Sequence, residues 1–263
     1  MTIQRLKTNT TFYIGFFLAL IPILLHIISV VIPHFLFSDS TNINTTTITE
    51  WLGFSQSLKY TYIFYLSLPF FCSLSLNQCI FEDVHSGFLN RIIFYSSIKK
   101  YWFSSMLISF IGGFFTVALP LLLDLSATYA FLPLLRPDWM INSLLPSLQL
   151  TYFHTLYYEN PLILILIYIL IGGILGGICT MLSSLAALFC KHRTVVISFP
   201  LIVCLSLAIL TIQFPKIFFD PTTIAIAYSP DYLPPFIKVL ILAIILPIVL
   251  YLIGIERIRR LVN

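Results

Sequence analysis

The residues best placed to do chemistry lie in one polar stretch, Cys79 to Trp102, between two long apolar runs. Glu82 and Asp83 open the stretch, and Lys99 and Lys100 close it. Its apolar residues recur at helical spacing, and acids at the start with lysines at the end suit a helix dipole. The pattern predicts an amphipathic helix lying at a membrane surface, with its polar face turned to a partner in the water. A solvated loop with a fortuitous period is the alternative.

Other catalytic and binding motifs are missing from the sequence. It contains no GxSxG, GxxxxGKS/T, CxxC or HExxH motif, and no lysine follows a glycine. Nucleotide-phosphate loops and zinc sites need such spacings, so neither is predicted, and no nucleophile–base pair indicates an intramembrane enzyme. The five cysteines lie in or beside apolar runs, as small core residues do. The apolar runs carry almost no acids, so the energy for any uphill transport is expected to come from another subunit.

The composition predicts an all-α integral membrane protein. Hydrophobic residues make up 59% of the chain and charged residues 9%, whereas soluble domains are about 25% charged. Backbone groups in lipid must be satisfied within the segment, which favours helices. The apolar runs are continuous and about 20 residues long, the length that crosses a bilayer. A transmembrane β-barrel would instead show alternating segments of about ten residues.

Six membrane spans are predicted within a single domain, residues 1–263. The polar stretch falls between the second and third spans, and Asp124 is expected to end the third. His26, in the first span, is either a functional group or a packed neutral side chain. Short helices are expected on the outer face within residues 127–160, as a lid or as a packing belt, and residues 213–236 are expected to dip into the outer leaflet. The spans are residues 12–37, 58–80, 102–123, 161–189, 195–212 and 237–255.

The fourth span contains four glycines that form two overlapping GxxxG pairs: Gly172, Gly173, Gly176 and Gly177. Small residues one turn apart let helix backbones pack closely in lipid. The pairs predict a helix-packing face, which serves either an interface between subunits or a contact inside this chain.

Basic residues predict the orientation. With six spans, both termini and the polar stretch share one side, and that side collects most of the basic residues: Arg5, Lys7, Arg91, Lys99, Lys100, Lys191, Arg193, Arg257, Arg259 and Arg260. The other side has only Lys59, Arg136, Lys216 and Lys238. The positive-inside rule therefore predicts cytoplasmic termini. The net charge of +4 is a topology signal of this kind, and no nucleic-acid partner is expected.

The arrangement resembles the permease subunit of type-2 ABC exporters. In that family, the segment between spans 2 and 3 has an acidic start, a glycine, a hydrophobic run, a break and a basic residue. This chain offers Glu82, Gly87, Phe88–Tyr95, Ser96–Ser97 and Lys99–Lys100, without the usual proline in the break. The resemblance implies a coupling helix that docks into a separate ATPase subunit, which binds the ATP; this chain is expected to bind no cofactor. The implied contact residues are Glu82, Asp83, Gly87, Phe88, Leu89, Arg91 and Ile92.

The resemblance also implies a function. The expected role is outward movement of a hydrophobic or amphipathic substrate (a peptide, a drug or a lipid) across a bacterial plasma membrane by two permease copies, identical or different. The compact chain is similar to permeases for antimicrobial-peptide and lantibiotic export or immunity. The alternative is a membrane scaffold or sensor, without transport, that docks a cytoplasmic partner through residues 82–100.

Overall fold

A computed structural model describes most of the chain, with no strand among the residues it describes. These residues are 10–37, 45–55, 57–74, 77–89, 91, 97–135, 151–215, 217–227 and 233–262. The helices are α2 (Thr10–His26), the π-helical turn η1 (Ile27–Val31), α3 (Ile32–Phe37), α4 (Leu58–Leu74), α5 (Asn77–His85), α7 (Ile98–Phe131), α8 (His154–Glu159), α9 (Pro161–Ala186), α10 (Arg193–Gln213), α11 (Pro221–Ala225) and α12 (Phe236–Val262).

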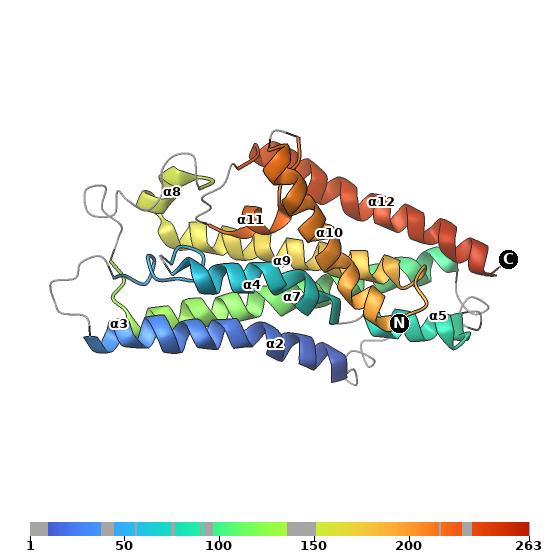
Figure 1. Ribbon diagram of the computed structural model, residues 1–263, viewed down its shortest axis with the longest axis horizontal. Helices are drawn as coiled ribbons and strands as arrows, with labels where there is room; N and C mark the ends of the chain where they lie inside the picture. The colour runs from blue at the N-terminus through green and yellow to red at the C-terminus, as the bar shows by residue number, and fades with distance from the viewer. Residues whose placement is uncertain are drawn as a thin grey trace.

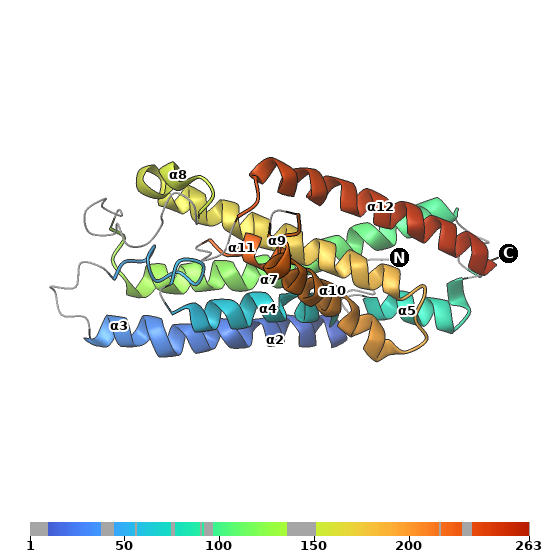
Figure 2. The same ribbon diagram turned by 45° about the horizontal axis from the view of Figure 1, so that its top comes forward.

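Within the described residues, five helical segments are long and apolar enough to cross a membrane. They are Thr10–Phe37, Ile98–Phe131, Pro161–Ala186, Arg193–Gln213 and Phe236–Leu261. The shorter α4 runs beside them, and successive long helices alternate in direction along the long axis (Figures 1 and 2). The predicted class of an all-helical membrane protein is therefore confirmed.

The third predicted span differs from the helix that forms there. We expected residues 102–123 with Asp124 at the end, whereas α7 runs from Ile98 to Phe131. The helix starts early because the Ser97 side chain accepts a hydrogen bond from the Lys100 backbone N–H, an N-cap. It continues past Asp124 because this carboxylate is buried with hydrogen-bond partners inside the bundle.

The first span is interrupted by η1. Pro33 has no backbone N–H, so it cannot donate to the carbonyl of Ser29, and the wider turn Ile27–Val31 precedes it. Such turns occur frequently at functional sites. Here the turn begins directly after His26.

The most extensively packed helix pair is α7 with α9, at the centre of a four-helix group that also contains α2 and α4. One hydrophobic cluster fills this group, and a second lies where α7 and α9 meet α12, α5 and Leu89. By contrast, α10 is inclined to the others and diverges from α12 in both views (Figures 1 and 2).

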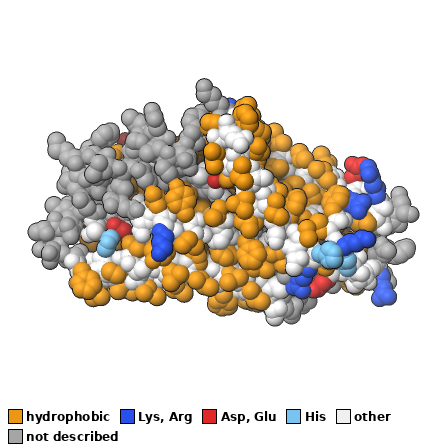
Figure 3. Space-filling model, in the orientation of Figure 1, with side chains coloured by type: hydrophobic (Ala, Val, Ile, Leu, Met, Phe, Trp, Pro, Cys, Tyr) orange, Lys and Arg blue, Asp and Glu red, His pale blue; other side chains and the backbone are white. Residues whose placement is uncertain are grey.

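The surface separates into an apolar middle and one basic end. Figure 3 shows hydrophobic side chains over much of the visible face, and Lys and Arg side chains gathered mostly where α5 and the C-terminal end of α12 lie. We call this the basic end. The opposite end holds α3 and the short helix α8 (Figure 1); residues 136–150 of the predicted outer ledge lie outside the described residues.

Candidate functional site

The predicted amphipathic helix does not form as one element. α5 ends at His85, and Gly87 then adopts a left-handed conformation, with φ of 70°. Such a glycine is a common helix terminator because it lacks a Cβ. Lys99 and Lys100 belong to the first turn of α7, so they do not close a helix begun at Glu82. The prediction of one amphipathic helix in the stretch Cys79–Trp102 is therefore wrong as to its continuity, although residues 90 and 92–96, including Ile92, lie outside the described residues.

The described part of the segment has an inner and an outer side. Glu82, Gly87, Phe88 and Arg91 are exposed at the basic end. Leu89 is buried in the second hydrophobic cluster.

Asp83 also points inward. It is buried and accepts a hydrogen bond of 3.0 Å from the hydroxyl of Tyr101, in the first turn of α7. Asp83 therefore connects the segment to α7, and a docked partner would touch its exposed neighbours.

α5 extends the bundle lengthwise. It lies nearly along the long axis in both views, beyond the end of α4 (Figures 1 and 2). The described helix therefore does not lie flat across the end of the bundle, as the amphipathic pattern predicted. The His85 ring stacks on Phe81 with centroids 4.0 Å apart, one turn away on the same face.

The four glycines of α9 face α7. A Cβ on Gly176 would lie 2.7 Å from the backbone carbonyl of Gly113, and one on Gly177 would lie 2.5 Å from the Phe110 ring. Gly173 meets the Phe114 ring in the same way, whereas Gly172 has ordinary room beside Val117 and Leu121. This face is thus occupied by a contact inside the chain. The hydroxyl of Thr180 donates across the same seam to the carbonyl of Ser109, at 2.7 Å.

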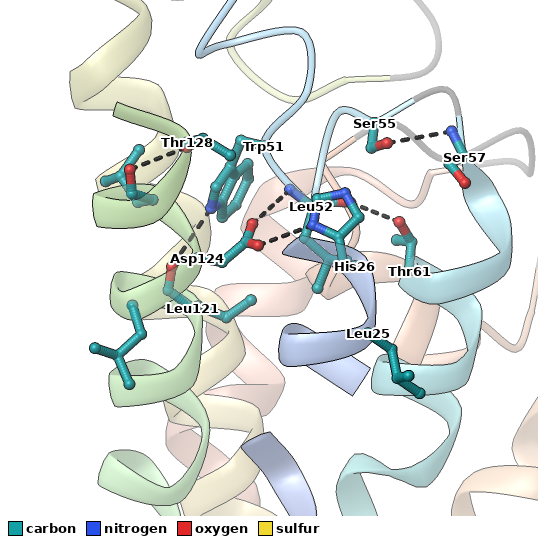
Figure 4. A network of polar contacts seen from close by, with 12 residues as sticks. Leu25, His26, Trp51, Leu52, Ser55, Ser57, Thr61, Leu121, Asp124 and Thr128 are labelled. Carbon is teal, nitrogen blue, oxygen red and sulfur yellow. Dashed lines mark hydrogen bonds and ion pairs between the residues drawn. The ribbon is translucent and has the colours of Figure 1, made fainter. Parts of the chain in front are cut away.

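A buried ionisable pair, not predicted from the sequence, lies in the other half of the bundle (Figure 4). His26 Nδ1 and Asp124 Oδ1 are 2.8 Å apart, and both side chains are fully buried. The second carboxylate oxygen of Asp124 accepts the backbone N–H of Leu52 at 2.9 Å. His26 stands edge-on to Tyr60, and its Nε2 has no hydrogen-bond partner in the described part of the chain. One carboxylate thus joins α2, α7 and the segment before α4.

Residues 45–55 form a plug within the bundle rather than an exposed polar loop. Ile48, Trp51, Leu52 and Phe54 are buried in the main hydrophobic cluster. The Leu52 carbonyl accepts the hydroxyl of Thr61 at 2.5 Å.

Two further contacts anchor the plug. Trp51 Nε1 makes a long contact of 3.5 Å to the Leu121 carbonyl (Figure 4). Phe54 packs on Tyr157 and Tyr168. The plug therefore contacts α4, α7, α8 and α9 and fills the bundle at the end opposite the basic one.

A second carboxylate, which belongs to the plug, lies near the His26–Asp124 pair. Glu50 is buried, and its Oε1 lies 3.4 Å from Nδ1 of His34. Burial raises the pKa of Glu50, while the charges of His34 and His26 and a hydrogen bond with Ser55 act in the opposite direction. Two carboxylates and two histidines thus surround the junction between the plug and α2.

This network can fix the plug, because one carboxylate joins it to α2 and α7. An ionisable side chain inside a membrane protein is a functional candidate by default because burying it is costly. The sequence contained one signal, a histidine in one apolar run and an aspartate in another. Their pairing could not be recognised from a local sequence spacing, because the partners are 98 residues apart.

Comparisons with known protein families, with curated proteins and with solved structures find no match for this chain.

Proposed function

We propose that the chain is the membrane-spanning subunit of an ATP-driven ABC exporter, powered by a separate ATPase subunit. The observation that carries the proposal is the polar segment between α4 and α7, whose residues Glu82, Gly87, Phe88 and Arg91 are exposed at the basic end of an otherwise apolar bundle. In this proposal the exposed residues Glu82, Phe88 and Arg91 dock into the ATPase, together with Gly87 at the turn.

In the proposal α4 is the sixth span. Its 17 residues correspond to about 26 Å at 1.5 Å per residue, and spans range from about 17 to 25 residues. Six spans place both chain ends at the basic end. The positive-inside rule then makes this end cytoplasmic, which leaves α8 and the plug on the outer side.

A mechanical route from the ATPase to the plug runs along α7. Movement of the docked segment reaches α7 through the hydrogen bond between Tyr101 and Asp83. The same continuous helix carries Asp124 near its other end, where the carboxylate holds His26 and the plug backbone. ATPase closure would thereby shift the outer end of the bundle through a single helix of 34 residues.

The transported molecule would pass between two copies of the subunit. The interior of the four-helix group is filled by large side chains, with Trp51, Tyr65 and Tyr168 fully buried. The hydrophobic side chains exposed along the helices face lipid or a second copy. A peptide, a drug or a lipid would fit such an apolar path.

The test is affinity purification of the tagged protein from gently solubilised membranes of its own host, with mass spectrometry of bound proteins. Phe88→Ala and Arg91→Glu are compared with Arg259→Glu, the same charge reversal at an exposed position of α12 at the same end. We expect a stoichiometric soluble ATPase that is lost from the first two variants and kept by the third. Absence of an ATPase, or its retention in all variants, would overturn the proposal. A bound cytoplasmic protein without ATPase activity would favour the scaffold instead.

A further inference from the structure

A cavity of about 490 Å³ lies among α9, α10, α11 and α12. Its floor comes from Leu175, Ile178 and Cys179 of α9, and its walls from Cys204 of α10 and Ala243 of α12. All the side chains that line it are apolar, and the two thiols are the most polar among them. Pockets for small organic ligands have volumes of about 300–1,000 Å³ but usually include placed polar groups. The interior of this cavity therefore suits a hydrocarbon chain.

A smaller hollow of about 230 Å³ adjoins the cavity, sharing Ile217, Phe218, Phe219 and Leu242 with it. Lys238, in the first turn of α12, lines this hollow. Its side chain is exposed, and it forms no ion pair within the described part of the chain. Asp220 precedes the lining residue Pro221, but its carboxylate accepts hydrogen bonds from the N–H and hydroxyl of Thr222. Lys238 thus lies at the rim of an apolar cavity without an ion-pair partner among the described residues.

We propose that this groove binds one acyl chain of an anionic phospholipid from the surrounding bilayer, with the lipid headgroup on Lys238. The proposal does not depend on the transport function. Its geometry follows from α10 and α12, which diverge and leave the groove between two membrane helices. The charge at one end and the hydrocarbon lining at the other match the two parts of such a lipid.

A helix of a second copy fits the groove less well. A helix with its side chains is about 10–12 Å across, so a cavity of this volume encloses only about one helical turn. An apolar side chain attracts a lipid tail no more strongly than another lipid tail does. The apolar lining alone therefore gives no preference among lipids. Selectivity comes from the charge, and one lysine near a membrane surface favours an anionic headgroup by about fivefold.

The experiment uses the full chain in phosphatidylcholine nanodiscs that contain a small fraction of phosphatidylglycerol with a photoreactive diazirine in its acyl chain. Cross-linked peptides are identified by mass spectrometry. We expect saturable labelling of α9 and α12 peptides that line the groove. Ala243→Trp, which fills the cavity, should abolish this labelling. Ile244→Trp should keep it, because Ile244 is the next residue of the same helix, is exposed and is not part of the lining.

Lys238→Gln provides a second, milder test, which stands even if Ala243→Trp fails to fold. It should reduce the preference for the phosphatidylglycerol probe over a matched phosphatidylcholine probe by about fivefold. Labelling of α2 and α7 as strong as that of the groove would show ordinary surrounding lipid and overturn the proposal. Unchanged preference in Lys238→Gln would overturn it as well.

Discussion

The four-helix group and the α10–α12 region solve the problem of packing in a membrane differently. In the most apolar 18-residue stretch of each helix, the buried share is 50% in α7 and 56% in α9, against 17% in α10 and 6% in α12. The four-helix group encloses the plug, the glycine seam and the His26–Asp124 pair. The α10–α12 region instead borders an apolar cavity.

The difference shows which contacts specify structure in a lipid bilayer, where the surroundings are as apolar as the side chains. Helices in lipid gain little from apolar contact alone, so small residues and hydrogen bonds decide which faces meet. The four-helix group contains both small residues and hydrogen bonds at its helix contacts, and it is a closely packed unit. The α10–α12 region has few of either, and most of the apolar surface of these two helices is left exposed by the described residues.

Removal of Asp124 should cause the largest loss of stability. Asp124→Ala leaves His26 Nδ1 and the Leu52 N–H unpaired inside the bundle. Breaking a buried pair in this way costs about 3–5 kcal/mol. Thermal unfolding in detergent measures the loss. Glu159→Ala is the control, since Glu159 is an exposed carboxylate at the end of α8 and its replacement should cost no more than about 0.5 kcal/mol. Equal losses in the two variants would contradict a structural role for the buried pair.

Addition of a methyl group in the glycine seam should cause the second-largest loss of stability. In Gly176→Ala the new Cβ would lie 2.7 Å from the Gly113 carbonyl oxygen, and a backbone atom cannot rotate away. Overpacking of this kind costs about 1–3 kcal/mol. In Gly172→Ala, the control, the nearest atom is a Leu121 methyl at 3.4 Å. Alanine is also the better helix former, so this control should be neutral or slightly stabilised. If both variants lost the same stability, the close approach of α7 and α9 would not explain it.

A smaller and local effect is expected where α12 meets α7. Trp102 Nε1 donates to the Tyr251 carbonyl at 3.0 Å, and the indole ring covers Gly254. Trp102→Phe removes the hydrogen bond, worth about 0.5–1.5 kcal/mol. Hydrogen exchange should therefore accelerate in α12 from Tyr251 onward, with α9 unchanged. Leu107→Ala, at an exposed position further along α7, is the control. Acceleration spread evenly over α9 and α12 would show that the two regions are not separate units.

The helical class and the apolar runs could be predicted because both follow from local composition. Asp124 could not be placed, since a carboxylate after an apolar run resembles a helix end. Its partners, Leu52 and His26, are 72 and 98 residues away in sequence. Only the folded bundle brings them together.

Two segments show how local composition misleads. Residues 45–55 are rich in threonine, a composition typical of an exposed loop, yet Ile48, Trp51 and Phe54 anchor them inside the bundle. In the polar stretch, the period of apolar residues suggested one helix. The glycine at 87 and the capping serine at 97 were the signals that divide it.

Replacement of Glu50 should have the smallest effect, visible as a pH dependence. Burial raises the pKa of Glu50 above its usual value of 4.5. A raised pKa means that folding favours the protonated carboxyl. Glu50 therefore stabilises the fold most below pH 4.5, and this contribution is lost as the pH rises through the folded-state pKa. Glu50→Gln lacks this titration, so the stability of the wild type relative to the variant should fall with rising pH in thermal unfolding.

The neighbouring histidine sharpens this test. His34 lowers the pKa of Glu50, in opposition to burial. In a His34→Asn background the pKa of Glu50 should rise further, because the opposing attraction is gone. Two pairs of proteins are then compared: the wild type with Glu50→Gln, and His34→Asn with the double variant His34→Asn, Glu50→Gln. The pH dependence of the stability difference should be larger in the second pair. Parallel pH curves for the wild type and Glu50→Gln would contradict the burial of an ionisable carboxyl in the plug, and would place residues 45–55 closer to the outer loop that the sequence suggested.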